Sequence, residues 1–496
     1  MISKSVKLFF LLLVVGLGAF LASHFAHQHP FTSIKRVTKN ALRQLEWITH
    51  ASLDNAAVHG EIKFEKIALP NTADKHTSLA MGPDGKLYAS TLDGRIKRFA
   101  LRADGTLNDP EVIYTLQDAS GQRVPRLTIG FAFDPAATAD SLIVWVTHSS
   151  FVLHDGPDWD GKLTRLSGPN LEVLQDVLIH LPRSVNDHLS NSIAFGPDSA
   201  LYFVQGSNTA MGAPDEIWGY RKEHLLSAAV LRLDLSKYKS TLPLNVKTAE
   251  GGTYNPYAAD APLTVFASGI RNGYDLLWHS NGELYVPNNG SAPDGNTPAS
   301  VLDTRRPDGS TYNGPKVPAL LDVPLDEKDY MYRVEKGGYY GHPNPARGEY
   351  VMQGGNPTFQ NDPAQVESYP TGTLPDPNWR GYALELSAHN SPNGIIEYHG
   401  NAFNGELKGK ILVARLVYNS DILILEPGGS NNDIIGETAG ATIPGLGKLL
   451  MPLDLTEDVN TGNIYVSEFG GNNGRIVLLR PVSDNARSLL VHKKRN

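Results

Sequence analysis

The stretch SVNDHLSNSIAFGPDSALYFVQGS, residues 184–207, decides the fold class of this 496-residue chain. Residues 193–195 and 201–204 are apolar runs, and Gly-Pro-Asp-Ser at 196–199 between them has the composition of a tight turn. Two short apolar runs around such a turn predict a β-hairpin. His188 stands just ahead of the hairpin, where a rigid scaffold commonly holds a binding or catalytic side chain. The stretch therefore predicts a strand pair with a candidate site at its entry.

The same pattern recurs along the chain, with Tyr88, Val144, Tyr202, Tyr285, Leu412 and Tyr465 at equivalent positions and spacings of 56, 58, 83, 127 and 53 residues. The copies are LAMGPDGKLY (79–88), GFAFDP with LIVWV (130–146), LLWHSNGELY (276–285), GIIEY with GKILV (394–413) and LDLTEDVNTGNIY (453–465). Further strands follow at 94–99, 229–234, 422–425 and 474–479. Six all-β repeats of this length predict an all-β, six-bladed β-propeller. A β-sandwich with accidental similarity is the alternative, although few sandwiches run this long as one domain.

Composition agrees with short strands and frequent turns. The chain has 47 Gly and 33 Pro and shows no long amphipathic helical period beyond its N-terminus. A net charge of −8 and a pI near 6.1 argue against nucleic acid as a partner. The absence of cysteine fits a body without disulfides and assigns no compartment.

The chain begins with a targeting segment. Two lysines precede an apolar run over residues 8–22, which predicts a signal peptide or an uncleaved signal anchor at 1–23. Neither candidate cleavage site has the small residue expected three positions before the cut, so both alternatives stay open. The order of lysines and apolar run predicts an exported body, periplasmic or extracellular, whose N-terminus is a candidate membrane anchor. We expect a stalk at 24–60, the propeller at 61–482 and a basic tail at 483–496.

Two stretches interrupt the repeats. Residues 287–378 are rich in Pro, Gly, Asn and Asp, and residues 206–226 contain Trp218, Tyr220, Arg221 and His224. Long loops inside a compact domain are usually lids or binding loops. We expect both inserts to cover one mouth of the channel, with aromatic walls suited to a sugar-like ligand; plain surface decoration is the alternative.

Several motifs occur together in a fixed order: His188 with FGPD (195–198), GIRN (269–272), LYVPNNG (284–290), Asp329 and KGGYYGHPN (336–344). In order and spacing they resemble the glucose/sorbosone dehydrogenase family, six-bladed propellers typified by the soluble quinoprotein glucose dehydrogenases. The resemblance covers roughly residues 61–481. The Arg-Asn pair and the Gly-Gly-Tyr-Tyr-Gly run are fairly specific together, whereas the Gly-Pro-Asp hairpins alone are not.

The resemblance implies oxidation of a sugar, polyol or aldose with pyrroloquinoline quinone and calcium at the channel mouth; it does not indicate the electron acceptor that follows. His188 matches the general base that takes the substrate hydroxyl proton, a task that suits an imidazole near neutral pH. The backbone carbonyls of Gly290 and Ser291 match calcium ligands. The candidate cofactor-binding residues are Arg271, Asn272, Asn289, Asp329, Arg415 and Arg126.

The chain also departs from the family pattern. Ser207 stands where an aspartate orients the base, and no arginine occurs near Met451 and Leu453, where the family binds the cofactor carboxylates. Losing several charge-assisted contacts at about 1.5–3 kcal/mol each would weaken binding of a tricarboxylate severely. Two alternatives therefore remain: a carbohydrate- or protein-binding propeller without redox chemistry, and a calcium-dependent hydrolase such as a lactonase.

Overall fold

The computed structural model describes residues 62–118, 120–238, 241–358 and 364–482. Within these ranges the one α-helix is α3 (Thr115–Asp118), and strands make up nearly all other regular structure. The described residues belong to one compact unit, His59–Asn496. The expected signal or anchor segment (1–23), stalk (24–60) and basic tail (483–496) lie outside the described residues. In the part of the chain that is described, no helix is long and apolar enough to cross a membrane.

The hairpin expected around residue 197 is formed by β10 (Ser190–Phe195) and β11 (Leu201–Gln205), which pair antiparallel. In its turn, Asp198 accepts hydrogen bonds from the Tyr202 hydroxyl at 3.0 Å and from the Ala200 N–H at 3.2 Å. A Cβ on Gly196 would lie 2.5 Å from the Tyr202 ring, so glycine allows the ring to fold back over the turn. The pattern Gly-Pro-Asp followed by Tyr is therefore one structural unit.

The first repeat is built in the same way. Tyr88 donates its hydroxyl proton to Asp84 at 3.0 Å, and a Cβ on Gly82 would lie 2.5 Å from the Tyr88 ring. The recurrence of the sequence pattern is thus a recurrence of one hydrogen-bonded turn.

Six sheets form the blades of a propeller. Blade one is β2 (His76–Met81), β3 (Leu87–Thr91), β4 (Ile96–Phe99) and β5 (Glu111–Ile113). Blade two is β6 (Arg126–Phe133), β7 (Ile143–Ser150), β8 (Gly161–Ser167) and β9 (Val173–Leu181), with β13 (Leu244–Asn245) added in parallel at its edge. Blade three is β10, β11, β12 (Ala229–Leu233) and β14 (Leu263–Ser268).

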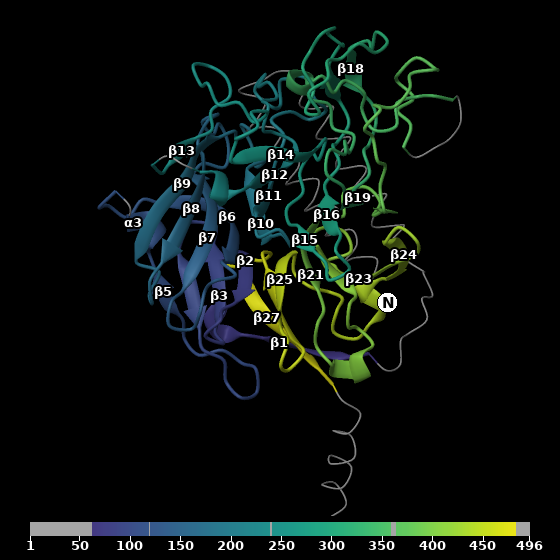
Figure 1. Cartoon of the computed structure of the whole chain (residues 1–496). Helices are drawn as coiled ribbons and strands as arrows, with labels where there is room; N and C mark the ends of the chain where they lie inside the picture. The colour runs from purple at the N-terminus through teal and green to yellow at the C-terminus, as the bar shows by residue number, and fades with distance from the viewer. Residues whose placement is uncertain (1–61, 119, 239–240, 359–363, 483–496) are drawn as a thin grey trace, which may run out of the picture. The chain divides into compact units, whose positions relative to one another are not determined.

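The other three blades complete the ring. Blade four is β15 (Leu277–Trp278), β16 (Leu284–Asn288), β19 (Tyr330–Val334) and β20 (Leu384–Glu385). Blade five is β21 (Pro392–Glu397), β22 (Ile411–Arg415), β23 (Asp421–Gly428) and β24 (Asp433–Thr438). Blade six is β25 (Pro452–Asp458), β26 (Asn463–Glu468), β27 (Arg475–Pro481) and β1 (Phe64–Ala68). Figure 1 shows the labels of β2, β6, β10, β15, β21 and β25 gathered round the centre, with the other strands further out.

The repeat positions read from the sequence are confirmed as second strands of the six blades: Tyr88, Val144, Tyr202, Tyr285, Leu412 and Tyr465 lie in β3, β7, β11, β16, β22 and β26. Strand β1 closes the ring by pairing antiparallel with β27, in a register that sets Phe64 opposite Pro481. The propeller prediction is therefore confirmed, and the sandwich alternative is wrong because each sheet stands beside its neighbours in a ring.

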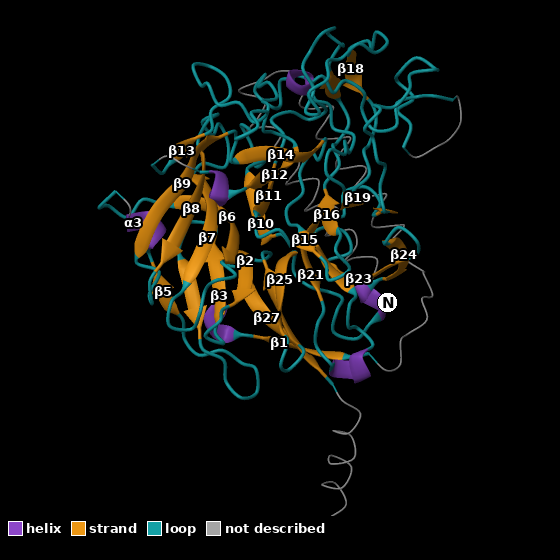
Figure 2. Cartoon of the chain, in the orientation of Figure 1, coloured by secondary structure: helices purple, strands orange, loops and turns teal. Residues whose placement is uncertain are grey.

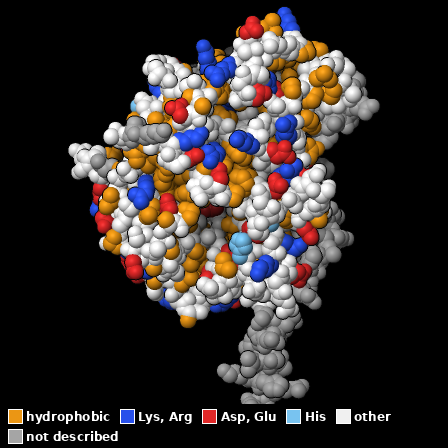
Figure 3. All heavy atoms as spheres, in the orientation of Figure 1, with side chains coloured by type: hydrophobic (Ala, Val, Ile, Leu, Met, Phe, Trp, Pro, Cys, Tyr) orange, Lys and Arg blue, Asp and Glu red, His pale blue; other side chains and the backbone are white. Residues whose placement is uncertain are grey.

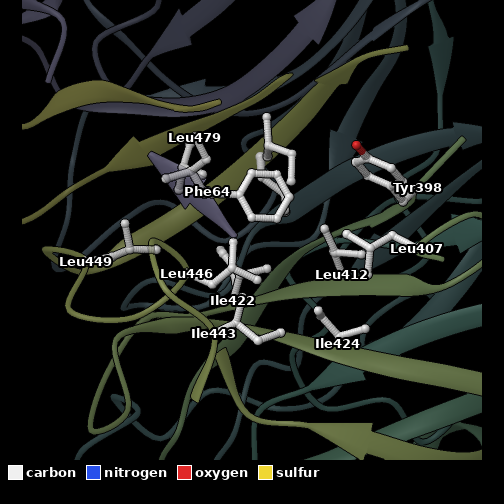
Figure 4. Close-up of a cluster of buried hydrophobic side chains, with 14 of the residues drawn as sticks. Phe64, Tyr398, Leu407, Leu412, Ile422, Ile424, Ile443, Leu446, Leu449 and Leu479 are labelled. Atoms are coloured by element: carbon white, nitrogen blue, oxygen red, sulfur yellow. The ribbon is translucent and has the colours of Figure 1, made fainter. Parts of the chain in front are cut away.

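The core lies between neighbouring blades. In β3, Leu87 and Ala89 face blade six, and the intervening Tyr88 faces blade two. Strands buried on both faces are apolar throughout, which is why the second strands read as continuous apolar runs. Figure 4 shows the cluster between blades five and six, where Phe64 of the closing strand lies among side chains such as Leu479 and Ile422.

Two inserts cover one end of the ring. Residues 206–226 leave β11 and residues 289–329 leave β16, both at the end where the inner strands begin. With residues 341–378, apart from 359–363, they form what we call the cap, which carries the hairpin of β17 (Gly295–Thr297) and β18 (Leu320–Val323). The cap has its own buried cluster, in which Met211 and Trp218 pack with Tyr312, Tyr350 and Met352. Figure 2 shows the cap as a region made mostly of loops around β18.

The described surface does not concentrate one sign of charge on the face in view. Figure 3 shows Lys and Arg side chains interspersed with Asp and Glu, and apolar side chains scattered among them. This distribution accompanies the modest net charge of −8.

Candidate functional site

His188 lies just ahead of β10, at the end of the ring that the cap covers. Its backbone N–H donates to Ser184 Oγ at 3.0 Å, and its carbonyl accepts from the Ser184 N–H at 3.0 Å. Gly206 at the end of β11 permits this position, because a Cβ there would lie 2.8 Å from the His188 Cβ. The imidazole side chain is buried, with 3% of the residue exposed.

Ser207 orients the imidazole with two oxygens. The His188 Nδ1 lies 3.1 Å from the Ser207 carbonyl oxygen and 3.0 Å from its Oγ. The Ser207 hydroxyl donates its own proton to the Thr209 carbonyl at 2.8 Å, so both oxygens accept from His188 and we assign the proton to Nδ1. Burial and then the charge of Arg271 lower the pKa of His188 well below its usual value. The ring is therefore neutral near pH 7, with its lone pair on Nε2.

Trp218 of the cap covers the imidazole. The two rings are 4.5 Å apart between centroids, and the Arg271 guanidinium lies 5.6 Å from the centroid of the same indole. The expected aromatic wall is thus formed by Trp218, whereas Tyr220 is exposed and His224 stacks against Trp159 at 4.0 Å. The inserts bring an aromatic surface onto the candidate base.

Arg271 is a buried cation held by carbonyl groups. Its Nε donates to the Ala210 carbonyl at 3.0 Å, and Nη1 donates to the carbonyls of Asn289 at 3.3 Å and Gly290 at 3.1 Å. Among the residues that the structure describes, no carboxylate forms an ion pair with this guanidinium. Burial lowers the pKa of Arg271, and the charges of Glu327, Asp187, Asp329 and Glu223 oppose that shift. An anionic ligand would pair with the positive charge of this buried guanidinium.

The expected calcium loop, residues 289–291, is braced by two acids. The Gly290 N–H donates to Asp329 Oδ1 at 2.9 Å, and the Ser291 N–H donates to Glu327 Oε2 at 2.7 Å. The Ser291 carbonyl accepts from the Glu327 N–H at 3.0 Å, while the Gly290 carbonyl accepts from Arg271. The two oxygens that the resemblance assigns to calcium therefore face N–H donors. Burial raises the pKa of Asp329 to about 6.

Asparagine side chains converge beside this loop from blades three, four and five. Asn191 Nδ2 donates to Asn272 Oδ1 at 2.9 Å, and Asn289 Nδ2 donates to Asn393 Oδ1 at 3.3 Å. The Asn289 amide also donates to the Asn272 carbonyl at 3.1 Å. The structure thus brings the predicted residues Asn272 and Asn289 together with Arg271.

Tyr274 crosses the channel. Its hydroxyl donates at 2.6 Å to the carbonyl of Thr77, which belongs to blade one, whereas Tyr274 precedes the inner strand of blade four. Leu127, Ile129 and Leu189 pack beside the ring. Apolar and aromatic side chains therefore occupy the channel next to His188.

Arg415 and Arg126 have other partners. Arg415 in blade five donates from Nε and Nη2 to the two oxygens of Asp421, each at 2.7 Å. Arg126 in blade two donates from Nε to His148 Nδ1 at 3.1 Å. Within the described ranges, neither guanidinium makes a hydrogen bond to His188 or Arg271. The site around His188 has Arg271 as its cation.

Three residues that shape this site are not predicted from the sequence. Glu223 and His342 form a buried pair at 3.1 Å behind Ser207, and Glu327 braces Ser291. His342 belongs to the motif KGGYYGHPN (336–344) that carries the resemblance, but the motif alone does not predict a role for its imidazole. Glu223 stands in the aromatic insert between Lys222 and His224, where nothing in the sequence distinguishes it from a solvated acid.

Comparisons with known proteins support the fold. A sequence model described as strictosidine synthase-like, N-terminal, matches residues 78–99, which include most of β2 and all of β3 and β4. No curated protein matches the chain. Among solved structures, a putative oxidoreductase (glucose dehydrogenase) from Thermus thermophilus is 19% identical with a TM-score of 0.50, and the match covers 85% of this chain and 100% of that one.

Two fungal structures are similar to the same extent. The holo form of the PQQ domain of pyranose dehydrogenase from Coprinopsis cinerea is 13% identical with a TM-score of 0.51, covering 86% of this chain and 96% of that one. A calcium structure of a carbohydrate-active enzyme of family AA12 from Trichoderma reesei is 15% identical with a TM-score of 0.50, covering 86% and 99%. At these identities the likeness establishes the fold alone. The chain shares the propeller fold of these proteins, as the sequence resemblance implied.

Proposed function

We propose that the chain is an exported oxidoreductase that removes hydrogen from a hydroxyl-bearing carbon of a sugar, polyol or aldose, with pyrroloquinoline quinone as cofactor. One observation carries the proposal: a neutral imidazole with its lone pair on Nε2 lies next to a buried guanidinium that has no ion pair within the described chain. A base for the hydroxyl proton and a cation for an anionic cofactor are the two groups this reaction needs.

The residues present fit the quinone in part. Arg271 suits one carboxylate or a quinone oxygen, since a planar guanidinium forms strong hydrogen bonds to such groups. Trp218 offers an aromatic face to a planar molecule beside it. When bound, the quinone supplies the acceptor for the hydride. His188 takes the hydroxyl proton on Nε2, Ser207 keeps the ring oriented through Nδ1, and Trp218 with Tyr274 limits the entry of water.

The residues present do not fit calcium as the resemblance places it. A calcium ion needs free oxygens, but the Gly290 carbonyl accepts from the cationic Arg271 and the Ser291 carbonyl accepts from the Glu327 N–H. We therefore assign no step to calcium. Three structures with this fold are described by their names as glucose dehydrogenase, pyranose dehydrogenase and AA12 proteins, which favours a carbohydrate as the substrate class.

Reconstitution tests the proposal. The purified chain is titrated with pyrroloquinoline quinone, with and without calcium, and reduction of an artificial dye is followed with a panel of sugars and polyols. We expect dye reduction with at least one substrate, and its loss in His188→Ala and Arg271→Met. Asp104→Asn, at an exposed turn of blade one, is the matched surface control. Absence of quinone binding at high micromolar concentration would refute the proposal.

A carbohydrate-binding propeller without redox chemistry is the second candidate. Its supporting observation is the shortage of cations: Arg415 is paired bidentately with Asp421, and Met451 and Leu453 stand where the resemblance places arginines. Thermal-shift and glycan-binding screens separate the two candidates. Stabilisation by saccharides in the absence of quinone, with no dye reduction in its presence, would favour the binding module.

A further inference from the structure

Glu223 is a buried carboxylate that is fully supplied with donors. Its side chain has no exposed area, and its Oε1 accepts from the backbone N–H groups of Asn208 at 3.1 Å and Thr209 at 3.0 Å. The Thr209 hydroxyl donates to the same oxygen at 2.6 Å, and Ser227 Oγ donates to Oε2. His342 Nε2 lies 3.1 Å from Oε1. Burial alone would raise the pKa of Glu223, but the bonds and charge from these partners lower it to about 2.

Two of these donors belong to the segment that holds the candidate base. Glu223 clamps the N–H groups of residues 208 and 209, and the Thr209 carbonyl accepts from Ser207 Oγ at 2.8 Å. Ser207 in turn presents its carbonyl and Oγ to Nδ1 of His188. A carboxylate that fixes residues 207–209 therefore also fixes the direction of the imidazole.

The charge of Glu223 matters as well as its position. Ser207 offers His188 only neutral acceptors, so protonation of the ring would create a buried imidazolium without an ion pair at Nδ1. Among the described residues, the charges of Arg271 and His342 oppose protonation of the imidazole, and the charge of Glu223 favours it. Glu223 thus supplies a negative charge that favours the protonated base.

His342 joins this arrangement to the segment that carries Arg271. The backbone N–H of His342 donates to the carbonyl of Gly269 at 2.9 Å, and Gly269 stands two residues ahead of Arg271. The Glu223–His342 pair therefore links the segment that orients His188 to the segment that carries the candidate cation. The candidate base and the candidate cation are therefore both held, through their backbone segments, by the buried Glu223–His342 pair.

We propose that Glu223 is a positioning residue for His188: through residues 207–209 it fixes the imidazole, and its charge supports the imidazolium formed when His188 takes up the substrate proton. The inference rests on the proposed role of His188 as base. It assigns to a residue of the cap the electrostatic support that Ser207 does not supply.

Titration of His188 by NMR tests the inference without any cofactor. The full chain is labelled with isotope-enriched histidine, and the His188 resonance among the 16 histidines is assigned by its loss in His188→Gln. In Glu223→Gln we expect the pKa of His188 to fall below that of the wild type. Glu223→Asp keeps the charge on a shorter side chain, so we expect its His188 pKa to stay closer to the wild-type value. If the enzyme is active, kcat should drop in Glu223→Gln by part of the roughly 10²–10⁴-fold that a general base contributes, with KM little changed.

The matched control is Glu397→Gln. Glu397 is also buried and accepts from a backbone N–H and a hydroxyl, those of Ser280, at the opposite end of the ring. We expect this variant to lose stability without any change in the titration of His188. An unchanged His188 pKa in Glu223→Gln would overturn the proposal, whether or not dye reduction is ever observed. If Glu223→Gln does not fold, the His188 resonance of Glu223→Asp is measured instead: the shorter side chain cannot hold the N–H groups of residues 208 and 209 as Glu223 does, so an unshifted resonance would overturn the positioning role.

Discussion

Replacing Gly206 by alanine should disturb His188 directly. A Cβ at this position would lie 2.8 Å from the His188 Cβ, 3.2 Å from its Cα and 3.3 Å from its carbonyl carbon. These neighbours are backbone or begin the side chain, so no flexible end can move aside. The Gly206 N–H donates to the Leu189 carbonyl at 2.8 Å, and its carbonyl accepts from Ala228 at 3.2 Å, so the glycine is also held in place.

The size of the effect follows from overpacking. Forcing one methyl group into a well-packed site costs about 1–3 kcal/mol in the free energy of unfolding. Because the contact is with His188 itself, the added methyl should push the imidazole away from Ser207. A displacement of about 1 Å in a catalytic group can cost on the order of a hundredfold in rate. We therefore expect a modest loss of stability and a large loss of activity.

Chemical denaturation, histidine NMR and dye reduction measure the three consequences of Gly206→Ala. The matched control is Gly436→Ala in β24, where the new Cβ would meet the Glu426 side chain at an ordinary 3.4 Å. We expect this control to keep wild-type stability and an unshifted His188 resonance. The packing argument would be refuted if Gly206→Ala unfolded like the wild type and left the His188 resonance in place.

Three further predictions concern the predicted site residues. Burial raises the pKa of Asp329 from 3.8 to about 6, so between these pH values the folded chain keeps a proton that the unfolded chain loses. The protonated Asp329 therefore contributes to the free energy of unfolding below pH 3.8, and this contribution of about 3 kcal/mol is lost as the pH rises through 6. Unfolding titrations from pH 4 to 7 should show a flatter profile in Asp329→Asn, and identical profiles would contradict this. Without quinone, calcium should not raise the melting temperature relative to a chelator, since the Gly290 and Ser291 carbonyls already accept N–H donors; a clear stabilisation would show that the loop opens for the ion. Arg415→Met should lower the unfolding free energy by about 3–5 kcal/mol, because it leaves the buried Asp421 without its partner, while quinone affinity measured by fluorescence should stay unchanged.

The fold could be predicted because its signals are local and repeated. Asp198 and Tyr202 meet across a turn of four residues, and the same bond at Asp84 and Tyr88 makes the pattern visible in the sequence. The pairing of β1 with β27 that closes the ring was not predicted, because the residues around Phe64 form no repeat and pair with the far end of the chain.

For the site, the sequence predicts which residues lie together but not the hydrogen bonds between them. Arg271, Asn272 and Asn289 do lie together near His188, since motifs at the same ends of neighbouring blades must meet round one axis. Their bonds depend on loop conformations that have no periodicity in sequence. Arg271 reaches the Gly290 carbonyl from a different segment of the chain, and Glu223 reaches Thr209, and through it Ser207, because residues 206–226 fold back on themselves.

Closure of the ring by β1 has a consequence for how the chain matures. Glu65 and Arg480, which pair across the last sheet, are 415 residues apart, so the sixth blade stays incomplete until the final strand has left the ribosome. Until then Phe64 lacks the part of its cluster that β27 supplies, Val477 and Leu479. A nascent chain of this kind would expose the unpaired β1 and its apolar side chains to chaperones during synthesis, until β27 pairs with β1 and completes the sixth blade.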